Sequence, residues 1–96
     1  MKTYEIEFFE AALKEWRKLS PDLRRQFTKK LAERVQNPHV PAARLHSMPA
    51  CYKIKLRSSG YRLIYQVDDG ILTVAVVSVG KRERNEAYVV AAKRLN

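Results

Sequence analysis

Between residues 51 and 57, cationic and apolar side chains alternate, and a Ser-Ser-Gly sequence separates this segment from a second strand-like segment, residues 61–67. Every second position from 53 to 57 is Lys53, Lys55 or Arg57, and the residues between them are apolar. Successive residues of a strand point to opposite faces of a sheet. The pattern therefore predicts a β-hairpin with one face that covers a core and one face that is cationic.

The turn of this hairpin sets which cations face each other. A two-residue turn at Ser59-Gly60 is the expected connection, and it would place Arg57 opposite Arg62 and Lys55 opposite Ile64. Like charges directly across a strand pair are destabilising. We therefore expect that an anion belongs on this face.

The composition supports an anionic partner. The chain has 19 Lys and Arg against 10 Asp and Glu, for a net charge of +9, and from Arg34 to Val67 it has six cations and no acid. A compact protein with this excess commonly binds a polyanion, and nucleic acid is the leading candidate.

The chain length and the cysteine content indicate the type of domain and its compartment. Ninety-six residues form one domain, residues 1–96, with a single modest core. The lone Cys51 is expected to be a buried thiol in a reducing compartment. No apolar run is long enough for a bilayer and no signal-peptide pattern is seen, so we expect a cytoplasmic protein without a membrane partner.

The remaining segments predict an α+β domain. Residues 3–8 alternate like a strand, residues 9–19 have helical spacing, and a second helix is predicted from Ser20-Pro21 to Asn37-Pro38. Residues 71–79 read as a strand buried on both faces, and residues 85–95 as a short, weak helix. We expect an antiparallel sheet with an N-terminal strand, a two-helix hairpin packed on the sheet and a short C-terminal helix.

The second predicted helix separates apolar from cationic residues. Its apolar stripe, at four-residue spacing, should pack on the sheet. Its cations are expected on the solvated outside: Arg24, Arg25, Lys29, Lys30 and Arg34.

Several kinds of chemistry are disfavoured by the sequence. His39, His46 and Cys51 lack metal-ligand spacing, and no glycine-rich phosphate loop is present. No pair of carboxylates lies near the cationic strand, as two-metal phosphodiester cleavage would require. We therefore expect no metal and no cofactor.

A site of cations and tyrosines can still cleave RNA, because the ribose 2′-hydroxyl supplies the nucleophile. Lys53, Lys55, Arg62 and Arg82 would stabilise the charge that builds up on the phosphate, and Tyr88 would transfer a proton. Simpler interpretations remain open: Tyr88 can be a packing residue of the last helix, and the lysines can form a solvated strand face.

Three segments resemble the bacterial toxin family RelE. They are residues 48–67 (MPACYKIKLRSSGYRLIYQV), residues 78–84 (SVGKRER) and residues 12–19 (ALKEWRKL). The resemblance implies a microbial RNase-type fold and the toxin of a type II toxin–antitoxin system. It also implies a metal-independent endoribonuclease that cleaves messenger RNA in the ribosomal A site, by attack of the 2′-hydroxyl on the adjacent phosphate, and so inhibits translation.

The same resemblance assigns roles to residues. Lys53 and Lys55 match the family's catalytic lysines, Arg62 and Arg82 its phosphate-contacting arginines, and Tyr88 its terminal-helix tyrosine. Tyr88 would be the general base, and Arg82 the acid or the group that stabilises the leaving oxygen. Contacts to RNA are implied for Arg44, Arg57, Lys14, Lys18, Arg24, Arg25, Lys29 and Lys30. His46 departs from the family, which carries arginine there.

The resemblance also implies partners. These are a RelB-type antitoxin that wraps the toxin and disturbs the terminal helix, the ribosome through its small-subunit RNA, the A-site message, and operator DNA only through the antitoxin complex. Two alternatives stay open: a gyrase-poisoning toxin of the ParE branch, which shares the fold, and a non-enzymatic RNA-binding module.

Overall fold

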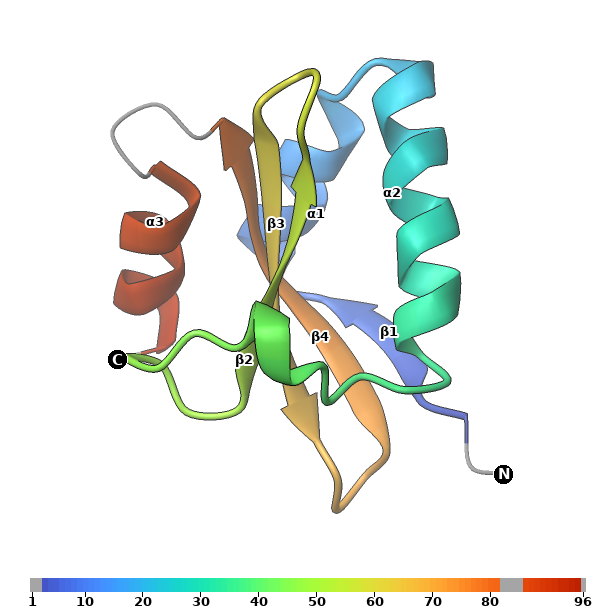
Figure 1. Cartoon of the computed structure of the whole chain (residues 1–96). Helices are drawn as coiled ribbons and strands as arrows, with labels where there is room; N and C mark the ends of the chain where they lie inside the picture. Colours follow the sequence, from blue (N-terminus) through green and yellow to red (C-terminus); the bar gives the residue numbers. More distant parts are fainter. Residues whose placement is uncertain (1–2, 82–85, 96) are drawn as a thin grey trace.

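The computed structural model describes residues 3–81 and 86–95, which form one four-stranded sheet with helices on both faces (Figure 1). The strands lie in the order β1-β4-β3-β2. They are β1 (Glu5–Phe8), β2 (Cys51–Leu56), β3 (Tyr61–Asp68) and β4 (Thr73–Lys81). The helices are α1 (Glu10–Arg17), α2 (Pro21–Arg34) and α3 (Glu86–Leu95), with a short 3-10 turn at Pro41–Ala43.

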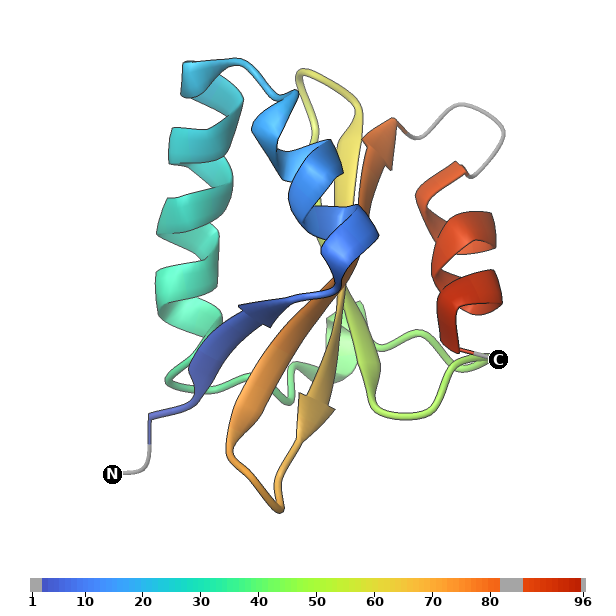
Figure 2. The ribbon, with the colours of Figure 1, turned by 180° about the vertical axis from the view of Figure 1, so that it is seen from behind.

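The predicted α+β class and the order of the elements are confirmed, and one detail differs. The sheet is mixed, because β1 runs parallel to β4 while the other neighbours are antiparallel. Figure 2 shows α2 and α3 on opposite sides of the strands, with α1 in front; α1 and α2 pack on one core of the sheet and α3 packs on the other. Alternation in a sequence fixes which residues share a face, but it does not fix the direction of the neighbouring strand.

The second helix begins where the sequence predicts. Ser20 caps it, its Oγ accepting a hydrogen bond of 3.3 Å from the Leu23 backbone N–H, and Pro21 occupies the first turn. Phe27 and Leu31, on the inward stripe, are fully or almost fully buried against the sheet. The helix therefore owes its place to an apolar stripe that its own sequence defines.

Strand β4 is buried on both faces, as predicted. Val74, Val76 and Val79 pack toward α1 and α2, whereas Val77 packs toward α3. A bulge explains this change of facing, because Ile64 pairs with Ser78 and Tyr65 pairs with Val76, which leaves Val77 without a partner in β3. After the bulge, Gly80 faces α3, and the first turn of that helix passes close to it.

The hairpin of β2 and β3 has the predicted faces but not the predicted register. Leu56 pairs with Tyr61 and Lys55 pairs with Arg62, so the loop spans residues 57–60 rather than Ser59-Gly60 alone. Gly60 adopts a φ of 77° in this loop, and its N–H bonds the carbonyl of Leu56 at 2.9 Å. The expected pairing of Arg57 with Arg62 is therefore wrong, and Lys55 takes the place opposite Arg62.

Arg34 also differs from expectation, since it points inward rather than to solvent. Its Nη1 donates to the Tyr65 hydroxyl at 2.8 Å and to the Lys53 carbonyl at 3.2 Å. Its guanidinium lies 5.7 Å from the centre of the Tyr65 ring. Arg34 thus covers part of the outer edge of β2.

Cys51 is fully buried, and burial raises the pKa of its thiol to about 11. The prediction of a buried thiol is confirmed. In the described part of the chain, none of the helices has the length and apolar character needed to cross a membrane.

The fold depends on the α2 stripe. We predict that Phe27→Ala lowers the free energy of unfolding by about 3–5 kcal/mol, because it removes a completely buried aromatic side chain from the core. Urea unfolding monitored by Trp16 fluorescence would measure the loss. Thr28→Ala, one position along on the exposed face, should change stability by less than about 0.5 kcal/mol. Equal losses in both variants would contradict this packing.

Candidate nucleic-acid interface and active site

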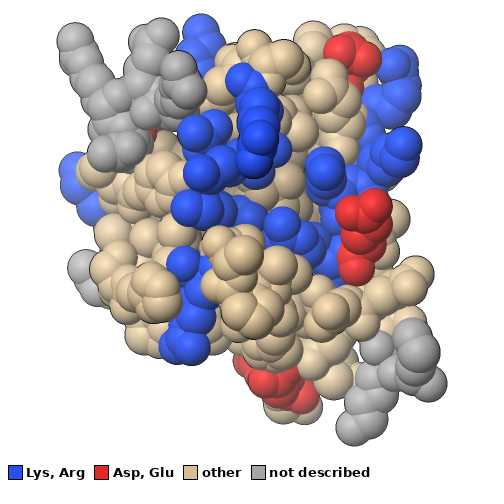
Figure 3. Space-filling model, in the orientation of Figure 1, with Lys and Arg blue, Asp and Glu red and all other residues tan. Residues whose placement is uncertain are grey.

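Three cations meet on the face of the sheet that α3 partly covers. Lys53 and Lys55 alternate with the buried residues of β2, and Lys55 pairs across the strands with Arg62. Ile64, opposite Lys53, belongs to the core under α3, which identifies the face. In Figure 3, Lys and Arg side chains gather over the β2–β3 hairpin and extend toward α2.

The proximity of these charges affects the ionisation of Lys55. The Lys53 ammonium lowers the pKa of Lys55 most, and burial, Arg62 and Arg57 lower it further. The face expected from the sequence is thus a cluster of like charges, in which Lys53, Arg57 and Arg62 lie close enough to Lys55 to lower its pKa. We call these four residues the cationic cluster.

Arg62 lies at the inner edge of this cluster. In the described part of the chain its Nε is buried without a hydrogen-bond partner. Arg62 pairs with Gly80 of β4, and a side chain added at Gly80 would meet the backbone of Ala87 at 3.7–3.8 Å. The first turn of α3 therefore lies beside Arg62.

Tyr88 occupies a hollow next to the cluster. It is half-buried and packs against the core that contains Cys51 and Ile64, the neighbours of Lys53 on this face. The hollow has a volume of about 540 Å³, and the segment after the 3-10 turn forms its other wall. It is lined by Arg44, Leu45, His46, Ser47, Met48, Tyr88, Val89 and Ala92. Arg44 and Tyr88, both predicted from the sequence, are thus brought together.

The remaining predicted site residues are less uniform. Arg82 lies outside the described residues. Arg24 donates to the carbonyl of Arg17, the last residue of α1, at 3.2 Å and to that of Leu19, in the connection to α2, at 2.5 Å, so it also has a structural role. Arg25 forms an exposed ion pair with Asp22. The other helix cations, Lys14, Lys18, Lys29 and Lys30, are exposed.

A second hollow connects the cationic cluster to α2. It measures about 340 Å³ and runs along the outer edge of β2. Lys30 and Arg34 line it together with Lys53, Lys55 and Arg57. The cationic surface therefore continues around the edge of the sheet. From the sequence, Arg34 was predicted to face solvent and was not named as a site residue, although its position seven residues after Phe27 places it on the inward side of α2.

The two histidines have different surroundings. His39 lies 2.9 Å from the Tyr52 hydroxyl and 2.8 Å from Asp69 Oδ1, which ties the connection after α2 to the β3–β4 turn. Tyr4 and His39 hold the pKa of Asp69 below its ordinary value. His46 instead lines the hollow that contains Tyr88.

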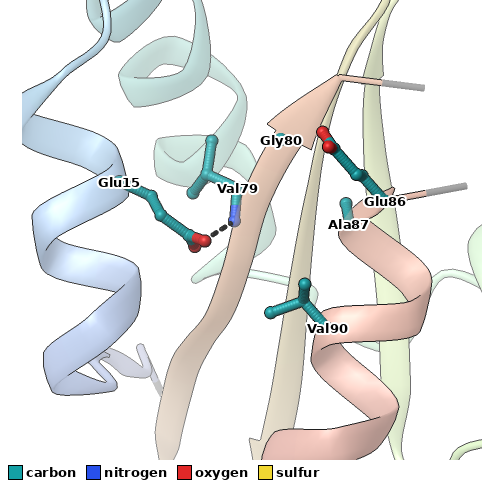
Figure 4. A pocket seen from close by; sticks show the side chains of 6 residues that line it. All are labelled: Glu15, Val79, Gly80, Glu86, Ala87 and Val90. Carbon is teal, nitrogen blue, oxygen red and sulfur yellow. Dashed lines mark hydrogen bonds between the residues drawn. The ribbon is translucent and has the colours of Figure 1, made fainter. Parts of the chain in front are cut away.

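An ion pair that was not predicted from the sequence joins α1 to α3. Glu15 is paired with Arg94 at 2.8 Å, and both side chains are largely shielded. Glu15 also lines a small pocket of about 220 Å³ between α1, β4 and the start of α3 (Figure 4). The two residues lie too far apart in sequence for a local pattern to link them.

Comparison with known proteins agrees with this fold. A family model described as ParE toxin of a type II toxin–antitoxin system, parDE, matches residues 6–86. The mRNA interferase toxin RelE of Escherichia coli K12 is 58% identical over 92 residues, which cover 96% of this chain and 97% of that protein.

Solved structures show the same relationship. An arginine-to-alanine double variant of E. coli toxin RelE in the free state aligns with a TM-score of 0.90 at 54% identity, covering 98% of this chain and 99% of that one. The toxin in the intact E. coli RelBE toxin–antitoxin complex aligns with a TM-score of 0.82 at 58% identity, covering 84% and 99%. The fold and the sequence are thus those of type II toxins. Within that class, the chain belongs to the RelE family.

The charge cluster makes a titration prediction. Replacing Lys53 with Met should raise the pKa of Lys55 toward its ordinary value, because the largest cause of its lowering is removed. Lys29→Met, on α2, should leave it unchanged. NMR titration of the lysine side chains would measure both. Because the pKa of Lys55 is lowered on folding, the unfolded chain binds more protons than the folded chain near that pKa. The contribution of Lys55 to the free energy of unfolding therefore rises with pH. An unchanged Lys55 titration in Lys53→Met would contradict the cluster.

Proposed function

We propose that this protein is the toxin of a type II toxin–antitoxin system and an endoribonuclease that cuts messenger RNA in the ribosomal A site. The observation that carries the proposal is the cationic cluster, in which Lys53, Lys55 and Arg62 converge beside the helix that bears Tyr88. The E. coli relative named mRNA interferase toxin RelE supports the activity.

The chemistry follows from the residue types. The ribose 2′-oxygen attacks the adjacent phosphorus, the new O2′–P bond forms, and the P–O5′ bond breaks to leave a cyclic phosphate and a 5′-hydroxyl. Tyr88 accepts the proton of the 2′-hydroxyl as general base. Lys53, Lys55 and Arg62 stabilise the added negative charge on the phosphate oxygens. Arg82 stabilises the leaving 5′-oxygen, which takes up a proton from water.

The cluster explains why substrate and site are complementary. Lysines held close together repel one another, and a phosphate placed among them removes that penalty. Arg62 presents a planar fork of donors that suits two phosphate oxygens. Because Tyr88 lies in a hollow of about 540 Å³, we propose that the ribosome supplies the alignment of the message that the free site lacks.

The surrounding cations would hold the complex. These cations are proposed to contact ribosomal RNA: Arg44, Arg57, Arg24, Arg25 and the exposed lysines Lys14, Lys18, Lys29 and Lys30. The inward-facing Arg34 extends this surface along β2. A RelB-type protein is the proposed antitoxin, since the E. coli relative is known in an intact RelBE complex. Operator DNA would be bound only through that complex.

Tyr88→Phe tests the catalytic assignment. We expect the rate of cleavage to fall about 100-fold or more, because the general base is lost, while ribosome binding changes little. Primer extension on a defined message in programmed ribosomes would show the cuts. Tyr61→Phe is the matched control, because Tyr61 packs on the other face of the sheet near Lys81. This variant should cleave at the wild-type rate. Cleavage at the wild-type rate by Tyr88→Phe would refute the assignment.

The salt dependence of binding separates the alternatives. Ribosome binding should weaken steeply as salt rises, and Lys55→Ala should flatten the dependence, because each phosphate contact releases counterions. Salt-sensitive binding without any cleavage would support the RNA-binding module. Neither binding nor cleavage on ribosomes, with inhibition of gyrase, would support the ParE-type activity.

A further inference from the structure

One edge of β4 changes partner halfway along the strand. Strand β1 pairs with it only as far as Phe8 opposite Val76, and the Phe9 N–H bonds the Val76 carbonyl at 2.9 Å before the chain turns into α1. Beyond that point, side chains take the place of a neighbouring strand. The Val79 N–H donates to Glu15 Oε1 at 3.1 Å, and the Val77 carbonyl accepts from Arg94 Nη1 at 2.7 Å.

Glu15 and Arg94 also bind each other in a fork. Arg94 Nη1 lies 2.8 Å from Oε1 and Nη2 lies 3.0 Å from Oε2 of the carboxylate. Only 21% of the Arg94 side chain and 29% of the Glu15 side chain are exposed. Shielding from water and the two-point geometry make such a pair stronger and more directional than a surface ion pair. We call Glu15 and Arg94 the clamp; Figure 4 shows Glu15 reaching β4 from α1.

The rest of the α3 attachment is small. Its two fully buried side chains are Ala87 and Ala91, each a single methyl group. Ser78 Oγ adds a hydrogen bond of 2.7 Å to the Ala87 carbonyl, and Leu95 packs at the rim. A ten-residue helix is marginal by itself in water. Tyr88 and Ala92 add contacts that are only partly buried, so α3 depends on the clamp for part of its placement.

We propose that Glu15 and Arg94 are positioning residues that fix α3 on the sheet and thereby hold Tyr88 in its hollow. The clamp binds the last turn of α3, and Ser78 and Gly80 lie beside Ala87 in its first turn. Both ends of the helix are therefore fixed on the sheet. Tyr88 follows directly after Ala87, and any displacement of the helix carries it away from Met48 and from the cationic cluster. The role of Tyr88 in cleavage rests on the proposed function. The placement of Tyr88 by the clamp does not.

NMR on the full chain tests the placement. In Arg94→Ala and in Glu15→Gln, amide exchange in α3 should accelerate about tenfold or more, whereas β3 should keep its protection. The nuclear Overhauser contact between the Tyr88 ring and the Met48 methyl group should weaken or vanish. Lys93→Ala and Glu10→Gln are matched controls, because each removes the same charge from an exposed neighbouring position. Arg94→Lys, which keeps the charge but not the fork, should fall between.

Cleavage by the same variants tests the consequence. On programmed ribosomes, the single-turnover rate should drop about tenfold or more in Arg94→Ala while the ribosome dissociation constant changes by less than about twofold. If the α3 amides of Arg94→Ala and Glu15→Gln stay as protected as in the wild type, the positioning role is wrong. It is also wrong if their exchange accelerates while the Tyr88–Met48 contact and the cleavage rate stay unchanged. If the wild type itself cuts no message, the proposed function fails, and the exchange and Tyr88 contact still decide the clamp. Glu15→Gln keeps an oxygen for the Val79 N–H, so it remains informative if Arg94→Ala does not fold.

Discussion

Burial of β4 on both faces is the constraint on which the rest of the structure depends. Its valines supply the floor of the core under α1 and α2, and the bulge turns Val77 and Ser78 toward α3. Without the extra residue, Gly80 would face the opposite side of the sheet. The bulge therefore places Gly80, which has no side chain, beneath the first turn of α3, where that helix approaches Arg62.

The cationic cluster is an unfavourable arrangement that this framework enforces. Ile54 and Leu56, buried between the cations, keep β2 in place while their neighbours Lys53 and Lys55 repel each other. A surface selected only for stability would carry acids among these lysines. The fold instead maintains a surface whose electrostatic energy would improve on binding an anion, as expected where stability is given up for the proposed function.

Sequence patterns specified the elements and the face of the hairpin because facing depends on periodicity alone. They did not specify the register, because moving β2 by two residues leaves every side chain on its original face and changes only the partners. Lys55 therefore replaced Arg57 opposite Arg62. Arg34 was assigned to solvent because it is charged, although its helical position is inward. The clamp was invisible, since Glu15 and Arg94 meet only through the tertiary fold.

The stability of Lys55→Met, measured together with its affinity for RNA, tests the central claim most directly. Methionine keeps the length of the side chain and removes the charge that Lys53, Arg62 and Arg57 oppose. We expect the variant to unfold at a higher urea concentration than the wild type, to bind ribosomes more weakly and to cleave more slowly. A variant that is less stable, or that binds and cleaves normally, would show that the cluster is an ordinary solvated strand face.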